Sequence, residues 1–210
     1  MISHLRREYT QSGLSEENLQ PDPQEQFKQW LQEAIDAELT EPNAGVLATV
    51  DSSGQPSTRV VLLKGVDNRG FSFFTNYESR KGRELAANPR AAMTFPWLEM
   101  ERQVCITGSV TKLSREESEN YFKMRPRGSR LGALVSRQSE IIASRTILET
   151  RLADLDKQYP GDDIPMPQNW GGYVLAPNAI EFWQGRPSRL HDRLLYTRAA
   201  DSWKIQRLSP

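Results

Sequence analysis

The chain has 210 residues, of which 37% are hydrophobic and 26% are charged, a balance typical of a soluble globular protein and not of a disordered one. Lysine plus arginine and aspartate plus glutamate number 27 each, so the formal net charge is zero. A global electrostatic argument for nucleic-acid binding therefore fails, although a local basic patch remains open.

The chain begins with a polar arm and an amphipathic helix. Residues 1–21 lack a sustained hydrophobic period and predict an arm that is ordered only where it docks; residues 22–210 form the single predicted domain. Asp22 is a favourable N-cap, and Pro23 suits the first helical position. A helix over residues 22–39 is predicted because apolar side chains recur at helical spacing at Phe27, Trp30, Leu31, Ala34, Ile35 and Leu39.

Short strands separated by turns follow, with helices on the longer connections. Predicted strands cover residues 45–50, 56–66, 71–76, 91–100, 101–113, 170–177, 179–185, 189–198 and 202–208. Predicted helices cover residues 79–89, 114–124, 131–136 and 143–159, the last two after a break at RPRGS. This order predicts a mainly β chain with α-helices (α+β), an antiparallel barrel with peripheral helices. A doubly wound parallel sheet is disfavoured because helices do not alternate regularly with strands.

Several common motifs are missing. The sequence has no glycine-rich dinucleotide or P-loop signature, no G-x-S-x-G and no H-E-x-x-H. The single cysteine, Cys105, cannot form an internal disulfide, makes a poor zinc site with only two histidines, and is expected to be a buried structural thiol. The N-terminus has no apolar signal segment, and no stretch reaches the roughly 18 apolar residues of a membrane span, so we expect a cytoplasmic protein.

Basic residues gather beside aromatic or hydroxyl residues in six clusters, at 6–9, 58–64, 79–81, 121–129, 136–139 and 189–193. Any one cluster could be a solvated surface, but two favour a partner. In residues 58–64, charged ends bracket four apolar residues, which predicts a strand buried on both faces. If residues 189–193 form a strand, Arg189, His191 and Arg193 share one face, and an anion there would relieve their repulsion.

Phosphate is the natural anion, because arginine binds it bidentately and lysine as a point charge. Two basic sets could serve two phosphorylated ligands. Ser79 caps a helix whose N-terminus adds free N–H groups, while Arg59 and Lys64 reach one ligand only if a bulge or strand end intervenes. Phe182 is expected in the core, and Trp183 on the opposite face, where a flat ligand ring could rest.

The sequence resembles the pyridoxine/pyridoxamine 5′-phosphate oxidases over essentially its whole length, from HLRREYT to WKIQRLSP. The most specific stretches are RVVLLK, FFTNYESRK, FPWLEMERQV, RPRGSRLGALVSRQS, FWQG and RLHDR. The resemblance implies a split β-barrel that binds FMN, and a homodimer with FMN at its interface. It implies oxidation of pyridoxine 5′-phosphate and pyridoxamine 5′-phosphate to pyridoxal 5′-phosphate by hydride transfer to FMN, with O2 reoxidising the flavin to give hydrogen peroxide.

The resemblance also assigns roles by position. The implied FMN residues are Arg59, Val60, Val61, Leu62, Lys64, Phe74, Thr75, Arg80, Lys81, Gln103, Gln138, Ser139, Trp183 and Arg193. The implied substrate residues are Arg6, Arg7 and Tyr9 in a lid, Lys64, Tyr121, Arg125 and Ser129 at the phosphate, and Arg189 and His191 at the pyridine ring. Arg189 and His191 are also the expected catalytic residues, His191 as a candidate proton acceptor. Phe74 departs from the family, which often has tyrosine there, so any contact with FMN must be through backbone or packing.

Three alternatives remain open at this point. One is another split-barrel flavoprotein, such as a flavin reductase, and the second is a non-catalytic module that binds FMN or a B6 vitamer. Nucleic-acid binding is the third and is disfavoured by the zero net charge and by basic clusters spread over different elements.

Overall fold

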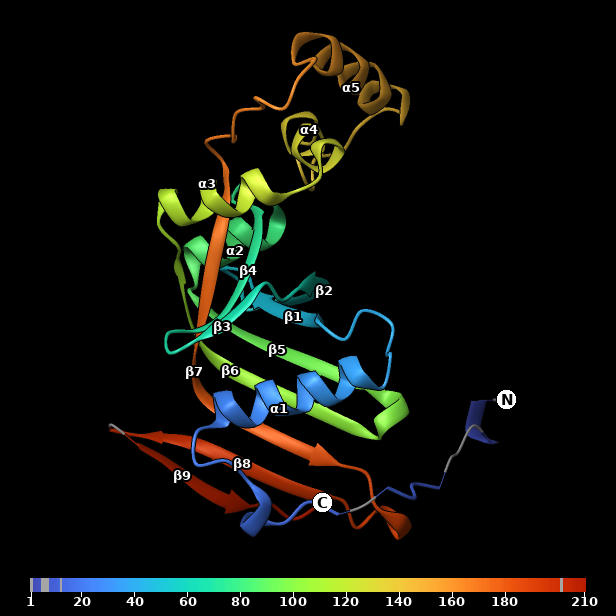
Figure 1. Ribbon diagram of the computed structural model, residues 1–210, viewed down its shortest axis with the longest axis vertical. Coiled ribbons are helices and arrows are strands. Elements are labelled where there is room, and N and C mark those ends of the chain that lie inside the picture. The colour runs from blue at the N-terminus through green and yellow to red at the C-terminus, as the bar shows by residue number, and fades with distance from the viewer. Residues whose placement is uncertain (1, 5–7, 12, 201) are drawn as a thin grey trace.

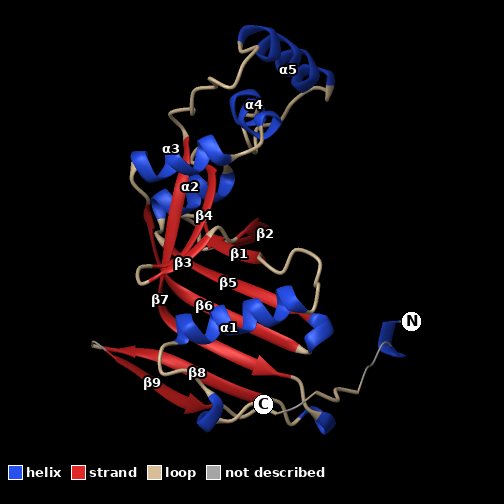
Figure 2. Cartoon of the chain, in the orientation of Figure 1, coloured by secondary structure: helices blue, strands red, loops and turns tan. Residues whose placement is uncertain are grey.

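The computed structural model describes residues 2–4, 8–11, 13–200 and 202–210. These residues form one curled antiparallel sheet of nine strands, with helices packed on it and at one end (Figures 1 and 2). The strands are β1 (Ala44–Val50), β2 (Pro56–Leu62), β3 (Gly65–Asp67), β4 (Gly70–Asn76), β5 (Arg90–Trp97), β6 (Arg102–Lys112), β7 (Trp170–Gln184), β8 (Asp192–Ala199) and β9 (Ser202–Arg207). The α-helices are α1 (Pro23–Asp36), α2 (Arg80–Ala87), α3 (Arg115–Met124), α4 (Arg127–Val135) and α5 (Thr146–Gln158).

The 15-residue strand β7 organises the sheet. The strand order is β2-β1-β5-β6-β7-β4-β3, and β8 pairs with β7 and β9. One edge of β7 pairs with β6, while the other is divided between β4 at the N-terminal half of β7 and β8 at its C-terminal half. The two strands predicted over residues 170–177 and 179–185 are therefore one strand, with a register shift where it faces Thr107 and Gly108. The predicted antiparallel barrel with peripheral helices is confirmed in its strand pairing.

Helix α1 supplies the apolar face that covers the sheet. The Asp22 carboxylate accepts a hydrogen bond of 2.8 Å from the backbone N–H of Gln24, as the predicted N-cap should. Phe27 is fully buried and meets Phe71 and Phe95 edge-on, each at 4.9 Å between ring centroids. Because α1 joins side chains from β4 and β5, its amphipathic face closes the main core.

Helices α3, α4 and α5 stand at one end of the sheet, at the top of Figure 1. Ser114 and Glu117 form the predicted capping box of α3. A second, smaller core formed by Phe122, Leu131, Ile164 and Trp170 packs beneath these helices. Helix α4 begins at Arg127, four residues before the predicted start, because Arg130 points back to the Asp162 carbonyl and carboxylate at 2.7 Å each and anchors its first turns.

The described part of the N-terminal arm docks on the opposite end of the sheet. The backbone N–H groups of Thr10 and Gln11 donate to the Glu101 carboxylate at 2.9 and 3.1 Å, and that of Leu14 donates to Asp192 at 3.0 Å. Leu14 is buried in the main core. These bonds order the arm, whereas its boundary at residue 21 stays a prediction.

Two further strand predictions and two burial predictions are wrong. The strand predicted over residues 56–66 ends at Leu62 and resumes at Gly65; β2 pairs only with β1, and Val60 is 63% exposed, so residues 58–64 are not buried on both faces. The strand predicted from residue 189 begins at Asp192. Ser188 and Arg189 have φ values of 57° and 61°, so Arg189 and His191 precede the strand and do not alternate with Arg193. Cys105 is half-buried rather than buried.

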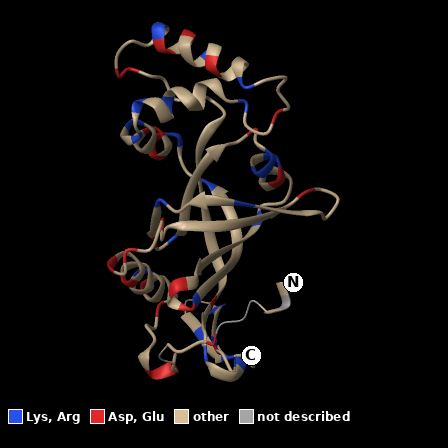
Figure 3. Cartoon of the chain, turned by 90° about the vertical axis from the view of Figure 1, so that its right-hand side faces the viewer, with Lys and Arg blue, Asp and Glu red and all other residues tan. Residues whose placement is uncertain are grey.

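Charges of both signs are interspersed over the helices and the sheet in the view of Figure 3, which agrees with the zero net charge. Within the described ranges, none of the helices has the length and apolar character that crossing a membrane requires.

Substitution of Phe27 by alanine should destabilise the fold by about 3–5 kcal/mol, because the side chain is fully buried among three other rings. The free energy of unfolding from urea titration measures the effect. Gln32→Ala, on the exposed face of α1, is the control and should change this free energy by less than about 0.5 kcal/mol. Equal losses in both variants would contradict the assigned core face.

Candidate functional site

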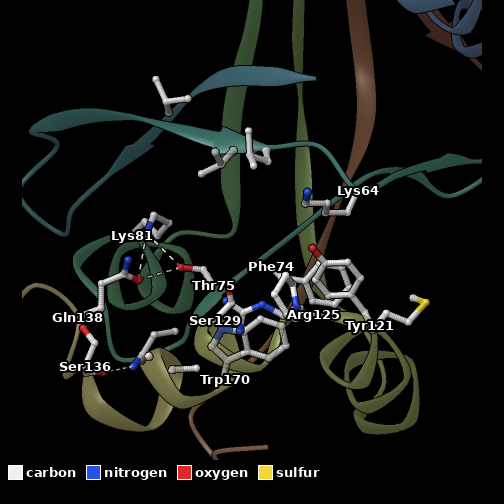
Figure 4. A pocket seen from close by; sticks show the side chains of 18 residues that line it. Lys64, Phe74, Thr75, Lys81, Tyr121, Arg125, Ser129, Ser136, Gln138 and Trp170 are labelled. Atoms are coloured by element: carbon white, nitrogen blue, oxygen red, sulfur yellow. Dashed lines mark hydrogen bonds between the residues drawn. The ribbon is translucent and has the colours of Figure 1, made fainter. Parts of the chain in front are cut away.

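A cavity of about 630 Å³ lies where β2 and β4 meet helices α2, α3 and α4 (Figure 4). It brings together the predicted residues Val60, Val61, Leu62, Lys64, Phe74, Thr75, Lys81, Tyr121, Arg125, Ser129 and Gln138. The rest of its lining, which the sequence did not single out, is Asn76, Met124, Pro126, Gly132, Ala133, Ser136 and Trp170. Residues from the predicted cofactor set and from the predicted substrate-phosphate set therefore share one cavity.

A buried ammonium group marks one end of the cavity. The Lys81 Nζ donates to the Thr75 hydroxyl at 3.0 Å and to the Gln138 side-chain oxygen at 3.4 Å, and the Thr75 hydroxyl donates to Gln138 at 3.2 Å (Figure 4). Lys81 is only 8% exposed. Burial, with the positive charge of Arg59 nearby, lowers the pKa of Lys81 to about 8, although Glu84 opposes this shift. An anion in the cavity would stabilise the charged amine.

The buried carboxylate of Glu84 holds two of the predicted cofactor residues. It accepts hydrogen bonds from the Arg80 Nε at 2.7 Å and the Arg59 Nη2 at 3.2 Å, and from the hydroxyls of Ser57 and Thr49. Burial alone would raise the pKa of Glu84, but these hydrogen bonds outweigh it and lower the pKa to about 2. Arg59 and Arg80 lie outside the cavity lining, beside the Lys81 end.

The other end of the cavity is aromatic and basic. The rings of Phe74 and Tyr121 stack with centroids 3.9 Å apart, and Trp170 lies parallel to both. Lys64 faces this end from the break between β2 and β3 (Figure 4). The sequence analysis required a bulge or a strand end between Arg59 and Lys64 if both were to reach one ligand. The end of β2 at Leu62 is such a strand end.

A second group of predicted residues lies at the far end of β7. The register pairs Trp183 with Gln103 on β6 and with Arg193 on β8, so the three side chains occupy one face. The Trp183 ring contacts those of Tyr9 and His191 at 5.7 and 4.7 Å between centroids. Phe182, its neighbour in sequence, is in the core as predicted.

Backbone and carboxylate groups hold the basic members of this second group. Arg193 forms two hydrogen bonds with the Glu181 carboxylate, at 2.7 and 3.1 Å, and these raise the pKa of Arg193. The backbone N–H of Arg186 donates to His191 Nδ1 at 3.1 Å. Arg189 is exposed on its turn. Because β7 separates this group from the cavity, one chain does not assemble all the predicted residues in one place (Figure 1).

The remaining predicted residues have these places. The Ser139 hydroxyl accepts a hydrogen bond of 3.1 Å from the backbone N–H of Arg80, whereas Arg6 and Arg7 lie outside the described residues. Sequence reasoning missed Glu84 and Trp170. The i,i+4 spacing of Arg80 and Glu84 on a predicted helix could have indicated the first. No sequence pattern indicated a role for Trp170. It begins a predicted strand, and the rings that it contacts in the structure belong to segments distant in the sequence.

Two family models match the chain, one described as "Pyridoxamine 5′-phosphate oxidase" over residues 31–159 and one as "Pyridoxine 5′-phosphate oxidase C-terminal dimerisation region" over residues 170–210. Two proteins named "Pyridoxine/pyridoxamine 5′-phosphate oxidase", from Paraburkholderia phytofirmans and Burkholderia mallei, are 58% and 56% identical to this chain. Each alignment covers 100% of this chain and 99% of the relative. The resemblance stated from the sequence is confirmed.

Solved structures agree on the fold. PhzG from Burkholderia lata, in complex with tetrahydrophenazine-1-carboxylic acid, has a TM-score of 0.88 at 34% identity, covering 92% of this chain and 95% of its own. A pyridoxamine 5′-phosphate oxidase-related, FMN-binding protein from Nostoc punctiforme has a TM-score of 0.69 at 19% identity, covering 92% and 99%. The second likeness shows the fold alone, and together they confirm the predicted split barrel.

Substitution of Glu84 by glutamine should lower the free energy of unfolding at pH 7 by an amount on the order of 2–4 kcal/mol, because it leaves buried donors without their carboxylate. The folded-state pKa of Glu84 lies below its ordinary value of 4.5, so its stabilisation is complete above pH 4.5 and is lost as pH falls toward about 2. Urea titration at pH 7 and at about pH 3 should therefore show a smaller difference from wild type at the lower pH. Glu99→Gln, at an exposed position, is the control, and a difference independent of pH would refute the assigned ionisation.

Proposed function

The chain belongs to the pyridoxine/pyridoxamine 5′-phosphate oxidase family, and we propose that its cavity binds FMN and the phosphorylated substrate side by side. The protein oxidises pyridoxine 5′-phosphate and pyridoxamine 5′-phosphate to pyridoxal 5′-phosphate, as a flavin-dependent oxidoreductase of vitamin B6 metabolism. The proposal adds FMN as the particular flavin, O2 as the final acceptor that gives hydrogen peroxide, and the residue roles below. A cytoplasmic location stays a prediction from the sequence.

The Lys81 end of the cavity suits the FMN phosphate. Both hydrogen-bond partners of the Lys81 amine in the cavity, Thr75 and Gln138, are neutral, so its charge is available to a phosphate dianion. The Arg80 Nε donates a hydrogen bond to Glu84 at 2.7 Å, and the residue as a whole is exposed. Arg59 directs both Nη atoms to protein oxygens, so its contribution is the positive charge beside the site more than a free fork of donors.

The free edge of β2 suits the flavin ring. Residues 60–62 line the cavity, and within the described part of the chain β2 pairs with β1 on one side only. The backbone N–H and C=O groups along the other edge are therefore available to a flat heteroaromatic ring that carries donors and acceptors at its rim. Phe74 contributes packing, as its lack of a hydroxyl requires.

The aromatic end of the cavity suits the substrate phosphate. Lys64, Tyr121, Arg125 and Ser129 converge there. The Arg125 Nη1 is buried and has no hydrogen-bond partner among the described residues. An unsatisfied buried guanidinium nitrogen is costly, and a phosphate oxygen would satisfy it. This orphaned donor is the observation that carries the assignment.

When bound, FMN would supply the acceptor for the hydride that leaves the C4′ carbon of the substrate. The hydroxyl or amine on that carbon must also lose a proton, and the chain's own residues would orient both groups. His191 Nδ1 accepts the backbone N–H of Arg186, so the neutral ring carries its proton on Nε2. In this tautomer His191 would donate a hydrogen bond to the substrate, while its candidate role as proton acceptor stays a prediction. Arg189 orients the group on C4′, and Arg193 places positive charge near the flavin.

A homodimer would complete the site. Arg189, His191 and Arg193 lie at the end of β7 that is far from the cavity, so they act on its contents only if a second copy presents its own β7–β8 end there. The match of residues 170–210 to a dimerisation region supports this arrangement. The 63% exposure of Val60 on the unpaired edge of β2, where the partner would pack, also supports it.

Purified protein supplied with FMN should be yellow and should release hydrogen peroxide aerobically with either phosphorylated substrate. Arg189→Ala should lower kcat/KM by about 100-fold or more through lost orientation, while the flavin spectrum persists. Arg198→Ala on β8, where the side chain packs on Trp203, is the control and should leave turnover unchanged. Unchanged turnover in Arg189→Ala would remove this residue from the mechanism, and a protein that cannot take up FMN would refute the cofactor assignment.

The dissociation constant of FMN should rise above pH 8, by up to about tenfold per pH unit, because the free-state pKa of Lys81 is about 8 and binding then requires protonation of the amine. Quenching of flavin fluorescence between pH 7 and pH 9 measures this. Lys81→Arg keeps its charge and should flatten the dependence, whereas the control Lys204→Arg should not. A slope that persists in Lys81→Arg would assign the titration to another group.

A further inference from the structure

Trp170, the first residue of β7, is 6% exposed and lines the cavity. Its ring lies parallel to those of Phe74 and Tyr121, with interplanar angles of 15° and 6°, and meets Phe122 edge-on at 5.1 Å between centroids. Rings from β4 and α3 therefore fix the Trp170 ring in one orientation.

Arg125 lies against the face of this ring. Its guanidinium carbon is 4.7 Å from the Trp170 centroid and 5.6 Å from that of Phe122, distances at which a cation is attracted to an aromatic face. Burial lowers the pKa of Arg125, Tyr121 opposes that shift, and no carboxylate contributes to it. Among the described residues no ion pair includes Arg125, and its Nη1 has no hydrogen-bond partner.

Neighbouring arginines of the same segment are held differently. Arg127 donates to the Asp156 carboxylate and to the carbonyls of Tyr159 and Gly161. Arg130 donates to the carbonyl and the carboxylate of Asp162 at 2.7 Å each. The Nε and both Nη atoms of Arg127 therefore donate to protein oxygens, and so do both Nη atoms of Arg130, whose buried Nε has no hydrogen-bond partner among the described residues. Arg125 instead has an aromatic partner, which attracts the charge and consumes no N–H donor.

We propose that Trp170 is a positioning residue for the substrate phosphate, holding Arg125 by a cation–π contact in place of a carboxylate. A carboxylate would compete with phosphate for the same planar set of donors, whereas the indole face leaves that set open toward the cavity. This inference rests on the proposed role of Arg125 in binding the substrate phosphate.

The same ring also lies near a second predicted phosphate contact. Tyr121 stacks directly on Phe74, at 3.9 Å between centroids, and lies parallel to Trp170 at 6.2 Å, while Phe74 is 5.5 Å from Trp170. The other two predicted contacts, Lys64 and Ser129, come from the β2–β3 break and from α4 and have no ring contact with Trp170 in the described structure. Loss of the indole should therefore weaken phosphate binding in part and should leave flavin binding unchanged.

The test compares Trp170→Met, which removes the aromatic face, with Trp170→Phe, which keeps a smaller one. KM for pyridoxamine 5′-phosphate should rise about 3- to 30-fold in the methionine variant and less in the phenylalanine variant, with kcat within about twofold of wild type. Turnover of unphosphorylated pyridoxamine, flavin content and the FMN dissociation constant should stay unchanged. Trp203→Met removes a similar contact, with Arg198 at 4.9 Å on β8 and β9, and should leave KM unchanged.

Arg125→Ala separates this inference from the function on which it rests. If Arg125→Ala leaves KM for the phosphorylated substrate unchanged, Arg125 does not bind the phosphate and the proposed assignment fails with the inference. If Arg125→Ala raises KM but both Trp170 variants match wild type, the inference alone fails. If the Trp170 variants lose activity equally on phosphorylated and unphosphorylated substrate, Trp170 acts through core packing and the inference is overturned. The phenylalanine variant keeps the ring contacts of the second core and gives a result even where the methionine variant is poorly folded.

Discussion

The close approach of three strands at the middle of β7 is the constraint on which the rest of the structure depends. A Cβ atom on Gly108 of β6 would lie 1.9 Å from the carbonyl oxygen of Ala176, and one on Gly70 of β4 would lie 2.0 Å from that of Leu175. Only glycine fits at these two positions, and Gly70 also has a φ of 138°. The crowding coincides with the register shift opposite Thr107 and Gly108, where β7 changes partner from β4 to β8.

This change of partner divides the proposed functional residues. The half of β7 that pairs with β4 carries Trp170 into the cavity, and the half that pairs with β8 carries Trp183 to the opposite end. Trp183 follows Trp170 by 13 residues, and a strand rises about 3.3 Å per residue, so the two groups lie about 40 Å apart along the strand. A single site containing both groups therefore requires a second copy of the chain, which is why the proposed function and the proposed homodimer depend on each other.

Three arrangements of positive charge serve different purposes in this molecule. Arg193 is paired with Glu181, and Arg59 and Arg80 share Glu84, so their positions are fixed by carboxylates. Lys81 is held by neutral oxygens, and Arg125 by aromatic faces. Among the described residues neither of the last two forms an ion pair, and burial lowers both pKa values, although Glu84 nearby opposes the shift of Lys81. Buried charged groups that form no ion pair in a cavity point to an anionic ligand, and here they lie at its two ends.

The sequence by itself determined most of each helix, most strands, the family and part of the cavity lining, because periodicity and capping act locally and the motifs are long and ordered. It could not place Glu84 between Arg59 and Arg80, or Trp170 beneath Arg125, since those contacts join β2 to α2 and β7 to α3. It also misplaced Arg189 and His191 on a strand. The left-handed turn at Ser188 and Arg189 contains no glycine, the residue that would have indicated such a turn. Only the tertiary structure decided these points, since which strand edge stays free and which buried charge lacks a counter-ion depend on contacts between segments distant in the chain.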